Sequence, residues 1–181
     1  MLTRFSVKGR MYLIIFSILI LFIVMAFFTI FTSNKVKDTG VDKTGQIMLQ
    51  DQKDKIQVAS HTAALTVGHA IEEVSDHDKK IEIIRKLLDD IRFEEDSSGY
   101  FFVYEGTVCV ALPTNKKLHG KDIGDLKDKN GVYLVRELRD KAKSGGGFVE
   151  YIWPKPGAGD TPKLGYAESL PGTDMWIGTG V

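Results

Sequence analysis

An uninterrupted apolar segment near the N-terminus constrains this chain more than any other feature. Residues 11–31, MYLIIFSILILFIVMAFFTIF, contain no charged side chain. At about 1.5 Å rise per residue, a helix of that length spans roughly the 30 Å hydrocarbon core of a bilayer. A cleavable signal peptide has a shorter apolar core of about 7–15 residues that ends in small residues, whereas this one ends in FFTIF. The sequence therefore predicts a retained transmembrane helix over residues 11–31.

The charges around this segment predict how it is oriented. Arg4, Lys8 and Arg10 precede it with no acidic residue among them. By the positive-inside rule, residues 1–10 are a cytoplasmic tail and residues 32–181 lie outside the membrane. In a bacterium this means the inner membrane and the periplasm. The formal net charge of the whole chain is +0, which gives no indication of nucleic-acid binding.

Residues 33–93 contain no proline and show helical periodicity. Apolar residues spaced by three or four predict one long helix that continues from the membrane segment. They are Ile56, Ala59, Ala63, Val67, Ala70 and Val74. A second helix is expected from about Lys79, with Asp76 or Asp78 as its N-cap.

From Gly99 onward the apolar period changes to two, which is typical of strands. Strands are expected over residues 100–104, 107–112, 148–153, 163–170 and 175–179, with a short amphipathic helix over 131–143 and a PKPGAGDTP loop. Hairpin-length links between strands predict an antiparallel sheet crossed by helices on one face. The fold class is therefore α+β.

Five motifs of this region, in order, carry a family resemblance. They are GYFFVYEG, the LP..KKLHGKDI..LKDKNG loop, GGGFVEYIWPKPG, LPGTDMWIGTGV and the long helix before them. Together they resemble the single Cache domain, the PAS-like extracellular sensor domain of bacterial methyl-accepting chemotaxis receptors and sensor kinases. The resemblance covers residues 32–181.

The resemblance implies a long N-terminal helix packed on a five- to six-stranded antiparallel PAS-like sheet. It also implies a pocket between the sheet and its loops that binds a small organic molecule, commonly a short carboxylate. In chemoreceptors the last strand leads to a second membrane helix, whereas this sequence stops at Val181, so we expect a fragment of a longer receptor. Many members carry a His before the proline of the second strand, where this chain has Leu112. A ligand contact that depends on that imidazole is therefore in doubt.

An acidic ligand needs fixed cations in a partly dry cleft. Arg92, at the end of the second helix, and Lys163, at the start of the fourth strand, are the candidates, since each lies where loops meet a sheet edge. The alternative for each is an ordinary surface charge or a salt bridge.

Aromatic side chains provide candidate walls for the pocket. Tyr100, Phe102 and Tyr104 share one strand face, and Tyr151 and Trp153 share another. Aromatic walls with a few phenolic donors suit a small ligand. The alternative, preferred for most of these rings, is core packing against the long helix.

Metal, cofactor and catalytic signatures are weak. Asp128, Asn130, Gly131 and Glu137 match four places of a calcium loop, but Leu126 stands where its first acidic ligand should be. Capping of the next helix by Asp128 and Asn130 is the simpler interpretation. No metal, cofactor or enzyme activity is expected, and the single Cys109 is expected to be a buried small apolar side chain.

The sequence thus favours the ligand-sensing domain of a transmembrane chemoreceptor, with the apolar stripe of its long helix available for a homodimer. Two alternatives stay open. One is the input domain of a sensor histidine kinase or diguanylate cyclase, and the other is a membrane-anchored periplasmic binding protein without cytoplasmic output.

Overall fold

The computed structural model describes residues 7–155 and 159–181 of the 181-residue chain. The first six residues of the predicted cytoplasmic tail, including Arg4, and the middle of the predicted PKPGAGDTP loop lie outside the described residues. The chain forms two compact units, residues 1–49 and residues 50–181, and each is considered by itself.

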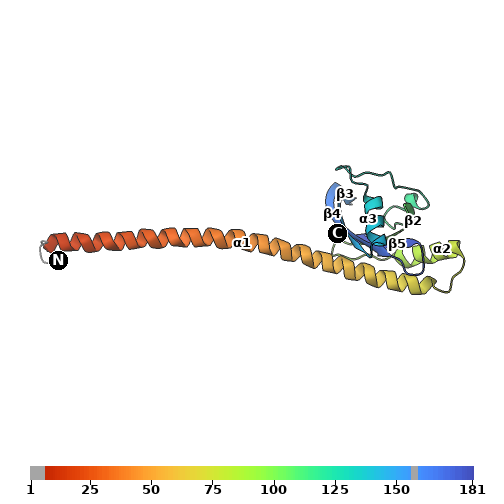
Figure 1. The fold of residues 1–181 in the computed structure, drawn as a ribbon, viewed down its shortest axis with the longest axis horizontal. Helices are drawn as coiled ribbons and strands as arrows, with labels where there is room; N and C mark the ends of the chain where they lie inside the picture. Colours follow the sequence, from red (N-terminus) through yellow and green to blue (C-terminus); the bar gives the residue numbers. More distant parts are fainter. Residues whose placement is uncertain (1–6, 156–158) are drawn as a thin grey trace. The chain divides into compact units, whose positions relative to one another are not determined.

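The first long element is helix α1, Val7–Ile71, shown in Figure 1. Its segment Met11–Thr32 has a mean hydropathy of 3.1 and none of it is buried in the structure. By length and composition this is the one helix in the described part of the chain that could cross a membrane. The helix then includes residues 50–71 of the second unit, which pack against a sheet.

The second unit is an α+β domain around one five-stranded antiparallel sheet with the strand order β2-β1-β5-β4-β3. Its elements are α2 (His77–Leu88), β1 (Phe101–Glu105), β2 (Val108–Ala111), the 3₁₀ helix η2 (Lys116–Leu118), α3 (Leu134–Lys143), β3 (Gly147–Lys155), β4 (Gly159–Ser169) and β5 (Met175–Gly180). The predicted α+β class and antiparallel sheet are confirmed. The Asp76 carboxylate accepts the Lys79 N–H and caps α2, as one of the two predicted caps.

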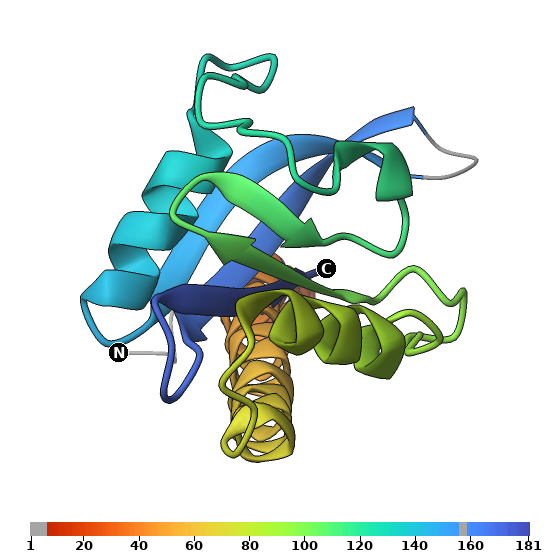
Figure 2. The ribbon, with the colours of Figure 1, turned by 90° about the vertical axis from the view of Figure 1, so that its right-hand side faces the viewer.

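Helices cover both faces of the sheet, so the prediction of helices on one face was wrong (Figure 2). Residues of α1 and α2 pack on Phe101, Val103 and Ile177, while α3 packs on the opposite face with Phe102 and Tyr104. The aromatic strand β1 is apolar on both sides because each side meets a different helix. The alternative interpretation of the candidate aromatic residues was core packing against the long helix. Their rings pack with α3 instead.

The hairpin β3–β4 is longer than predicted, and part of the PKPGAGDTP segment is strand. Ile152 pairs with Pro162 and Pro154 with Asp160, whereas β4 pairs with β5 only from Gly165 onward. The prolines thus lie in a two-stranded ribbon at the sheet edge, where a missing N–H breaks no ladder. An edge position explains why proline did not end these strands.

The buried face of α1 differs from the predicted stripe at its C-terminal end. Ile56 and Val67 are buried as expected, but the next contact is Ile71, while Ala70 is exposed. The helix ends at Ile71, so Val74 lies beyond it.

The same face also buries Ser60, whose hydroxyl is fully buried and has no hydrogen-bond partner among the described residues. A buried hydroxyl without a partner costs free energy that alanine does not. We expect Ser60→Ala to raise the free energy of unfolding by about 1 kcal/mol. Chemical denaturation measures this, with Ser144→Ala as control, since the exposed Ser144 hydroxyl only donates to Asp140 O. A loss of stability in Ser60→Ala would contradict the expectation.

Candidate functional site

The five predicted aromatic residues line one cavity between the sheet and α3. The lining consists of Tyr100, Phe102, Tyr104, Tyr151 and Trp153 together with Leu112, Leu134, Val135 and Leu138. The cavity measures about 20 Å³, which is room for about one water molecule. A larger molecule therefore requires α3 or its neighbouring loop to move away from the sheet.

Glycines in the inner strands let the rings lie flat on the sheet. A Cβ added at Gly165 would stand 2.7 Å from Tyr151 Cε1, and one added at Gly178 would stand 2.7 Å from Phe102 Cε2. A Cβ atom does not approach another carbon this closely, so a side chain at either position would force the neighbouring ring to move. The glycines of the sequence motifs LGYAES and IGTG thus leave the surface of the sheet flat beneath the aromatic rings.

The tyrosine hydroxyls of this cavity remain protonated over the whole neutral range. Burial raises the pKa of Tyr100, Tyr104 and Tyr151 well above the ordinary value. Hydrogen bonding from Thr114 and Trp153, followed by the charge of Arg92, opposes this rise at Tyr100. The phenols are therefore neutral groups that can donate hydrogen bonds.

Lys163 brings a positive charge to this group. Its side chain is only 6% exposed, and its Nζ lies 5.2 Å from the centroid of the Tyr100 ring. Lys163 also pairs with Tyr151 across strands β4 and β3. The surface-charge alternative is therefore wrong for Lys163, because a surface lysine would be exposed.

Arg92 lies apart from the cavity, although its charge reaches Tyr100. It is exposed, and its Nη1 donates to the carbonyl oxygens of Asp89 at 3.0 Å and Ile91 at 2.7 Å. The structure thus brings five of the seven predicted residues into the cavity lining, places Lys163 beside the Tyr100 ring and leaves Arg92 outside the cavity.

The α3 side of the cavity was missing from the predicted site. Leu134, Val135 and Leu138 belong to a predicted amphipathic helix, but its position over the aromatic strand face was not anticipated. The apolar period of that helix was the available signal. Leu112 lines the same cavity. It occupies the position at which the family resemblance led us to expect a histidine.

Asp128 anchors the loop before α3. Its carboxylate accepts the N–H groups of Asn130 and Val132 and, from β3, the N–H of Ile152, each at 2.8 Å. The residue before α3 is Tyr133, and no side chain caps the helix, so the predicted capping role of Asp128 and Asn130 was wrong. Within the described part of the chain, no group of three or more His, Cys, Asp or Glu side chains could hold a metal ion.

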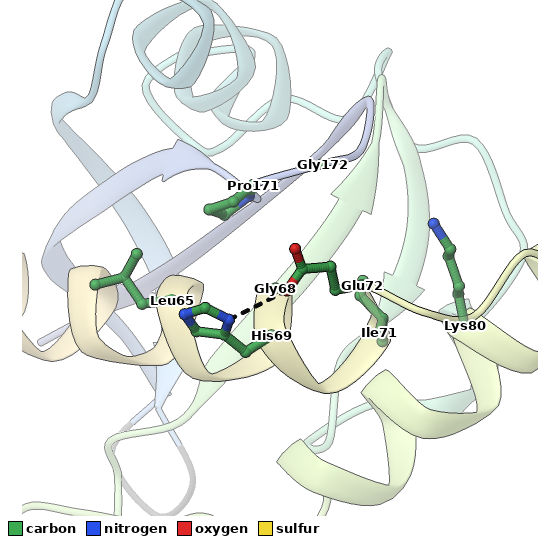
Figure 3. A pocket seen from close by; sticks show the side chains of 8 residues that line it. All are labelled: Leu65, Gly68, His69, Ile71, Glu72, Lys80, Pro171 and Gly172. Carbon is green, nitrogen blue, oxygen red and sulfur yellow. Dashed lines mark hydrogen bonds and ion pairs between the residues drawn. The ribbon is translucent and has the colours of Figure 1, made fainter.

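A second hollow lies between the end of α1 and the turn before β5 (Figure 3). It measures about 240 Å³ and is lined by residues that include Leu65, His69, Glu72 and Pro171. The His69 and Glu72 side chains, 3.4 Å apart, are 79% and 73% exposed. Polar side chains this exposed recognise an anion weakly because water competes for them, so this hollow is a poorer ligand site than the cavity beside Lys163.

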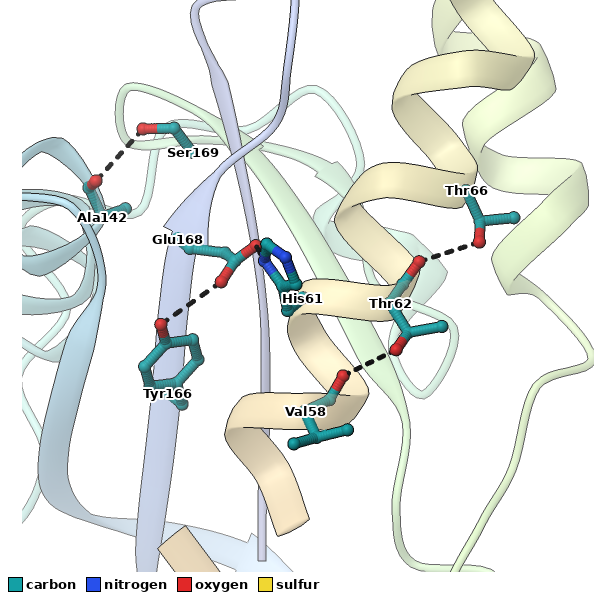
Figure 4. A network of polar contacts seen from close by, with 8 residues as sticks. All are labelled: Val58, His61, Thr62, Thr66, Ala142, Tyr166, Glu168 and Ser169. Carbon is teal, nitrogen blue, oxygen red and sulfur yellow. Dashed lines mark hydrogen bonds and ion pairs between the residues drawn. The ribbon is translucent and has the colours of Figure 1, made fainter. Parts of the chain in front are cut away.

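One polar network connects the sheet to α1 (Figure 4). Glu168 of β4 lies 3.0 Å from His61 Nδ1 of α1 and accepts the Tyr166 hydroxyl at 3.2 Å. The Glu168 side chain is only 13% exposed. Burial, and then the Glu168 charge, raise the pKa of Tyr166. The network lies on the face of β4 opposite to Lys163.

Known proteins are similar to this sequence. The family model described as Cache domain matches residues 32–181. The chain is 28% identical to the methyl-accepting chemotaxis protein CtpM of Pseudomonas aeruginosa, over 98% of this chain and 32% of that protein. It is 30% identical to the sensor histidine kinase MctS of Rhizobium johnstonii, over 87% of this chain and 34% of that protein. The chain thus spans about a third of the length of these relatives.

Solved structures share the fold. A methyl-accepting chemotaxis protein from Vibrio parahaemolyticus superposes with a TM-score of 0.67 at 30% identity, over 75% of this chain and 91% of that one. A Cache chemosensory domain that recognises carboxylic acid superposes with a TM-score of 0.65 at 28% identity, over 75% of this chain and 96% of that one. These matches confirm the resemblance drawn from the sequence motifs. The chain belongs to the Cache domain family of sensor domains.

Proposed function

We propose that this chain is the extracytoplasmic ligand-sensing part of a transmembrane chemoreceptor and that its ligand is a short carboxylate. The observation that carries this proposal is the buried Lys163, whose Nζ lies 5.2 Å from the centroid of the Tyr100 ring and whose cross-strand neighbour is Tyr151. The similarity to a Cache domain that recognises carboxylic acid supports the same chemistry. Trp153 and the other aromatic walls would exclude water around the bound ligand.

The recognition follows from charge and hydrogen bonding in a dry site. A carboxylate has two oxygens that accept hydrogen bonds, and it gains most from a cation that water does not screen. Lys163 supplies that cation, and the phenols supply neutral donors. Because the cavity holds about one water molecule in this conformation, the ligand is short and its entry widens the site.

The membrane topology completes the proposal. Residues 11–31 form the membrane helix, residues 1–10 lie in the cytoplasm, and residues 32–181 form the sensor domain outside a bacterial inner membrane. Within that domain, residues 33–93 are the helical part and residues 99–181 the sheet part. The basic residues before the apolar segment support this orientation.

Strand β4 is suited to transmit ligand binding to α1. It carries Lys163 on one face and Glu168, the partner of His61, on the other. Widening of the cavity would shift β4, and the Glu168–His61 contact would pass the shift to the helix. Displacements of one to two ångströms between helices are typical of such switches.

This transmission predicts a separation of binding from response. In the full chain, Glu168→Ala is expected to change the dissociation constant of the carboxylate less than about twofold, since Glu168 is outside the cavity. Ligand-induced changes in hydrogen exchange over α1 residues 52–66 should be lost. Glu150→Ala, an exposed acid on β3, is the control and should keep them. Ligand-induced exchange changes over α1 that remain as large in Glu168→Ala as in wild type would contradict the route through β4.

We propose a homodimer as the assembly. The apolar stripe predicted to form it packs on the sheet instead, with Ile56 and Val67 buried, so pairing would use the opposite side of α1. Val58 and Leu65 on the outer side of α1 are 65% and 44% exposed and lie one heptad apart. Pairing of two copies along this face would bury both side chains. Size-exclusion chromatography with light scattering of the full chain tests this, and a monomer at all concentrations would contradict it.

A sensor histidine kinase is the second candidate for the protein that contains this domain, since MctS is similar over 87% of this chain. The two candidates share the sensing function and differ only in output. A thermal-shift panel of acetate, propionate, lactate and succinate tests the sensing function. One acid at 100 times its dissociation constant should add about 2.7 kcal/mol of stability. Carboxylate sensing would be refuted if no acid raised the melting temperature, whether or not amino acids or sugars raised it.

A further inference from the structure

One histidine outside the cavity holds the end of strand β2 in place. His119 follows η2, and its Nε2 lies 3.0 Å from the backbone nitrogen of Leu112. A backbone N–H can only donate, so Nε2 accepts and carries no proton. The neutral imidazole therefore acts as a hydrogen-bond acceptor for the backbone of a cavity residue.

This bond fixes a wall of the cavity. Leu112 is 3% exposed and lines the cavity, and Thr114, two residues further on, hydrogen-bonds with Tyr100. Thr114 lies in a turn that is closed by the Asn115 N–H, which donates to Leu112 O. If His119 ceased to accept, the buried Leu112 N–H would lose its partner, which is costly in a dry site.

The charges around His119 favour its neutral form. Arg85 of α2, which donates to Val110 O, and Lys116 of η2 act on the ring as positive groups. Among the described groups that act on the ring, Asp89 is the one acid, and it is ion-paired with Lys116 at 2.6 Å. Burial first and the Arg85 charge second lower the pKa of His119 below its ordinary value.

We propose that His119 is a positioning residue for the ligand cavity, and that its protonation weakens ligand binding by releasing the segment from Leu112 to Thr114. The proposal rests on the carboxylate-sensing function proposed above. Because the pKa is lowered, the unfolded chain binds the proton more readily than the folded chain, and stability falls as the pH drops below about 6.5. A receptor of this kind would respond less to the same carboxylate in mildly acidic surroundings.

The test uses the full chain in detergent micelles and measures the dissociation constant of acetate, or of the tightest acid in the thermal-shift panel, at pH 7.5 and 5.5. Wild type should bind severalfold more weakly at pH 5.5, and by less than about tenfold, because a histidine whose pKa lies below 6.5 is only partly protonated at that pH. His119→Gln offers a carbonyl acceptor that does not titrate, so its affinity should change less than about twofold. His69→Gln, at an exposed histidine of α1, should keep the wild-type dependence.

A ligand-free measurement separates this proposal from the function on which it rests. Hydrogen exchange of the Leu112 amide, corrected for intrinsic rates, should increase in wild type between pH 7.5 and 5.5 and stay constant in His119→Gln. If no carboxylate binds at either pH, the proposed function fails, and the exchange result alone decides the role of His119. The proposal is overturned if His119→Gln retains the wild-type pH dependence of affinity or of Leu112 exchange, or if wild type shows neither.

Discussion

Lys163→Met is expected to weaken carboxylate binding by about 100-fold, because truncating one partner of a desolvated charge pair costs roughly 2–5 kcal/mol. Methionine has a similar length and keeps the packing beside Tyr100, whose ring lies 5.2 Å from Lys163 Nζ. Isothermal titration calorimetry of the full chain with the tightest carboxylate of the panel measures the loss.

The matched control is Lys117→Met, which removes the same charge from an exposed position of η2. Long-range charge has little influence at physiological ionic strength, so this variant should bind like wild type. Circular dichroism must show that Lys163→Met remains folded. A folded Lys163→Met protein that binds with wild-type affinity would contradict the role of Lys163.

Gly178→Val is expected to lower the stability of the domain by about 3 kcal/mol, which corresponds to a decrease in Tm of roughly 10 °C. A Cβ at residue 178 would stand 2.5 Å from the carbonyl oxygen of Tyr166 and 2.7 Å from Phe102 Cε2. The carbonyl belongs to the neighbouring strand and cannot move without breaking the ladder. Thermal denaturation of the full chain followed by near-ultraviolet circular dichroism measures the effect.

Gly45→Ala in α1 provides the contrast, since no atom lies within 4 Å of a Cβ added there. Alanine in a helix should be neutral or more stable by about 0.5–1 kcal/mol. Equal Tm values for Gly178→Val and wild type would show that the sheet is not closely packed around Gly178.

Local sequence patterns predicted the elements of this fold well. The period of two placed the aromatic strand β1, and the carboxylate before Lys79 placed the start of α2. Each of these signals acts within a few residues of the chain, which is why a single sequence reveals them. The membrane segment is equally local, since it depends only on length and apolar composition.

The arrangement of helices around the sheet could not be predicted in the same way. Both faces of β1 are apolar, so its alternation separates two groups of residues without showing which group meets α1 and which meets α3. The interpretation of Phe102 and Tyr104 as core residues therefore placed their rings against the long helix, whereas they pack against α3. A half-polar strand would have resolved the choice.

The sequence predicted most of the aromatic and basic residues of the site, but not the contacts that hold the surrounding loops in place. Lys163 and Tyr151 were both candidates, and the cross-strand pairing explains why they meet. The anchor of the loop, Asp128, reaches an N–H that is 24 residues away at Ile152, and no local pattern marks such a contact. Arg92 was chosen by its position at a helix end, and carbonyls of its own helix end hold it there.

The most direct test of the whole account is a crystal structure of the full chain with the tightest carboxylate of the panel bound. We predict that the carboxylate lies between the sheet and α3, with one oxygen within hydrogen-bond distance of Lys163 Nζ and the other near the hydroxyl of Tyr100 or Tyr151. Carboxylate density in the hollow beside His69 and Pro171, with the aromatic cavity unchanged, would contradict the account.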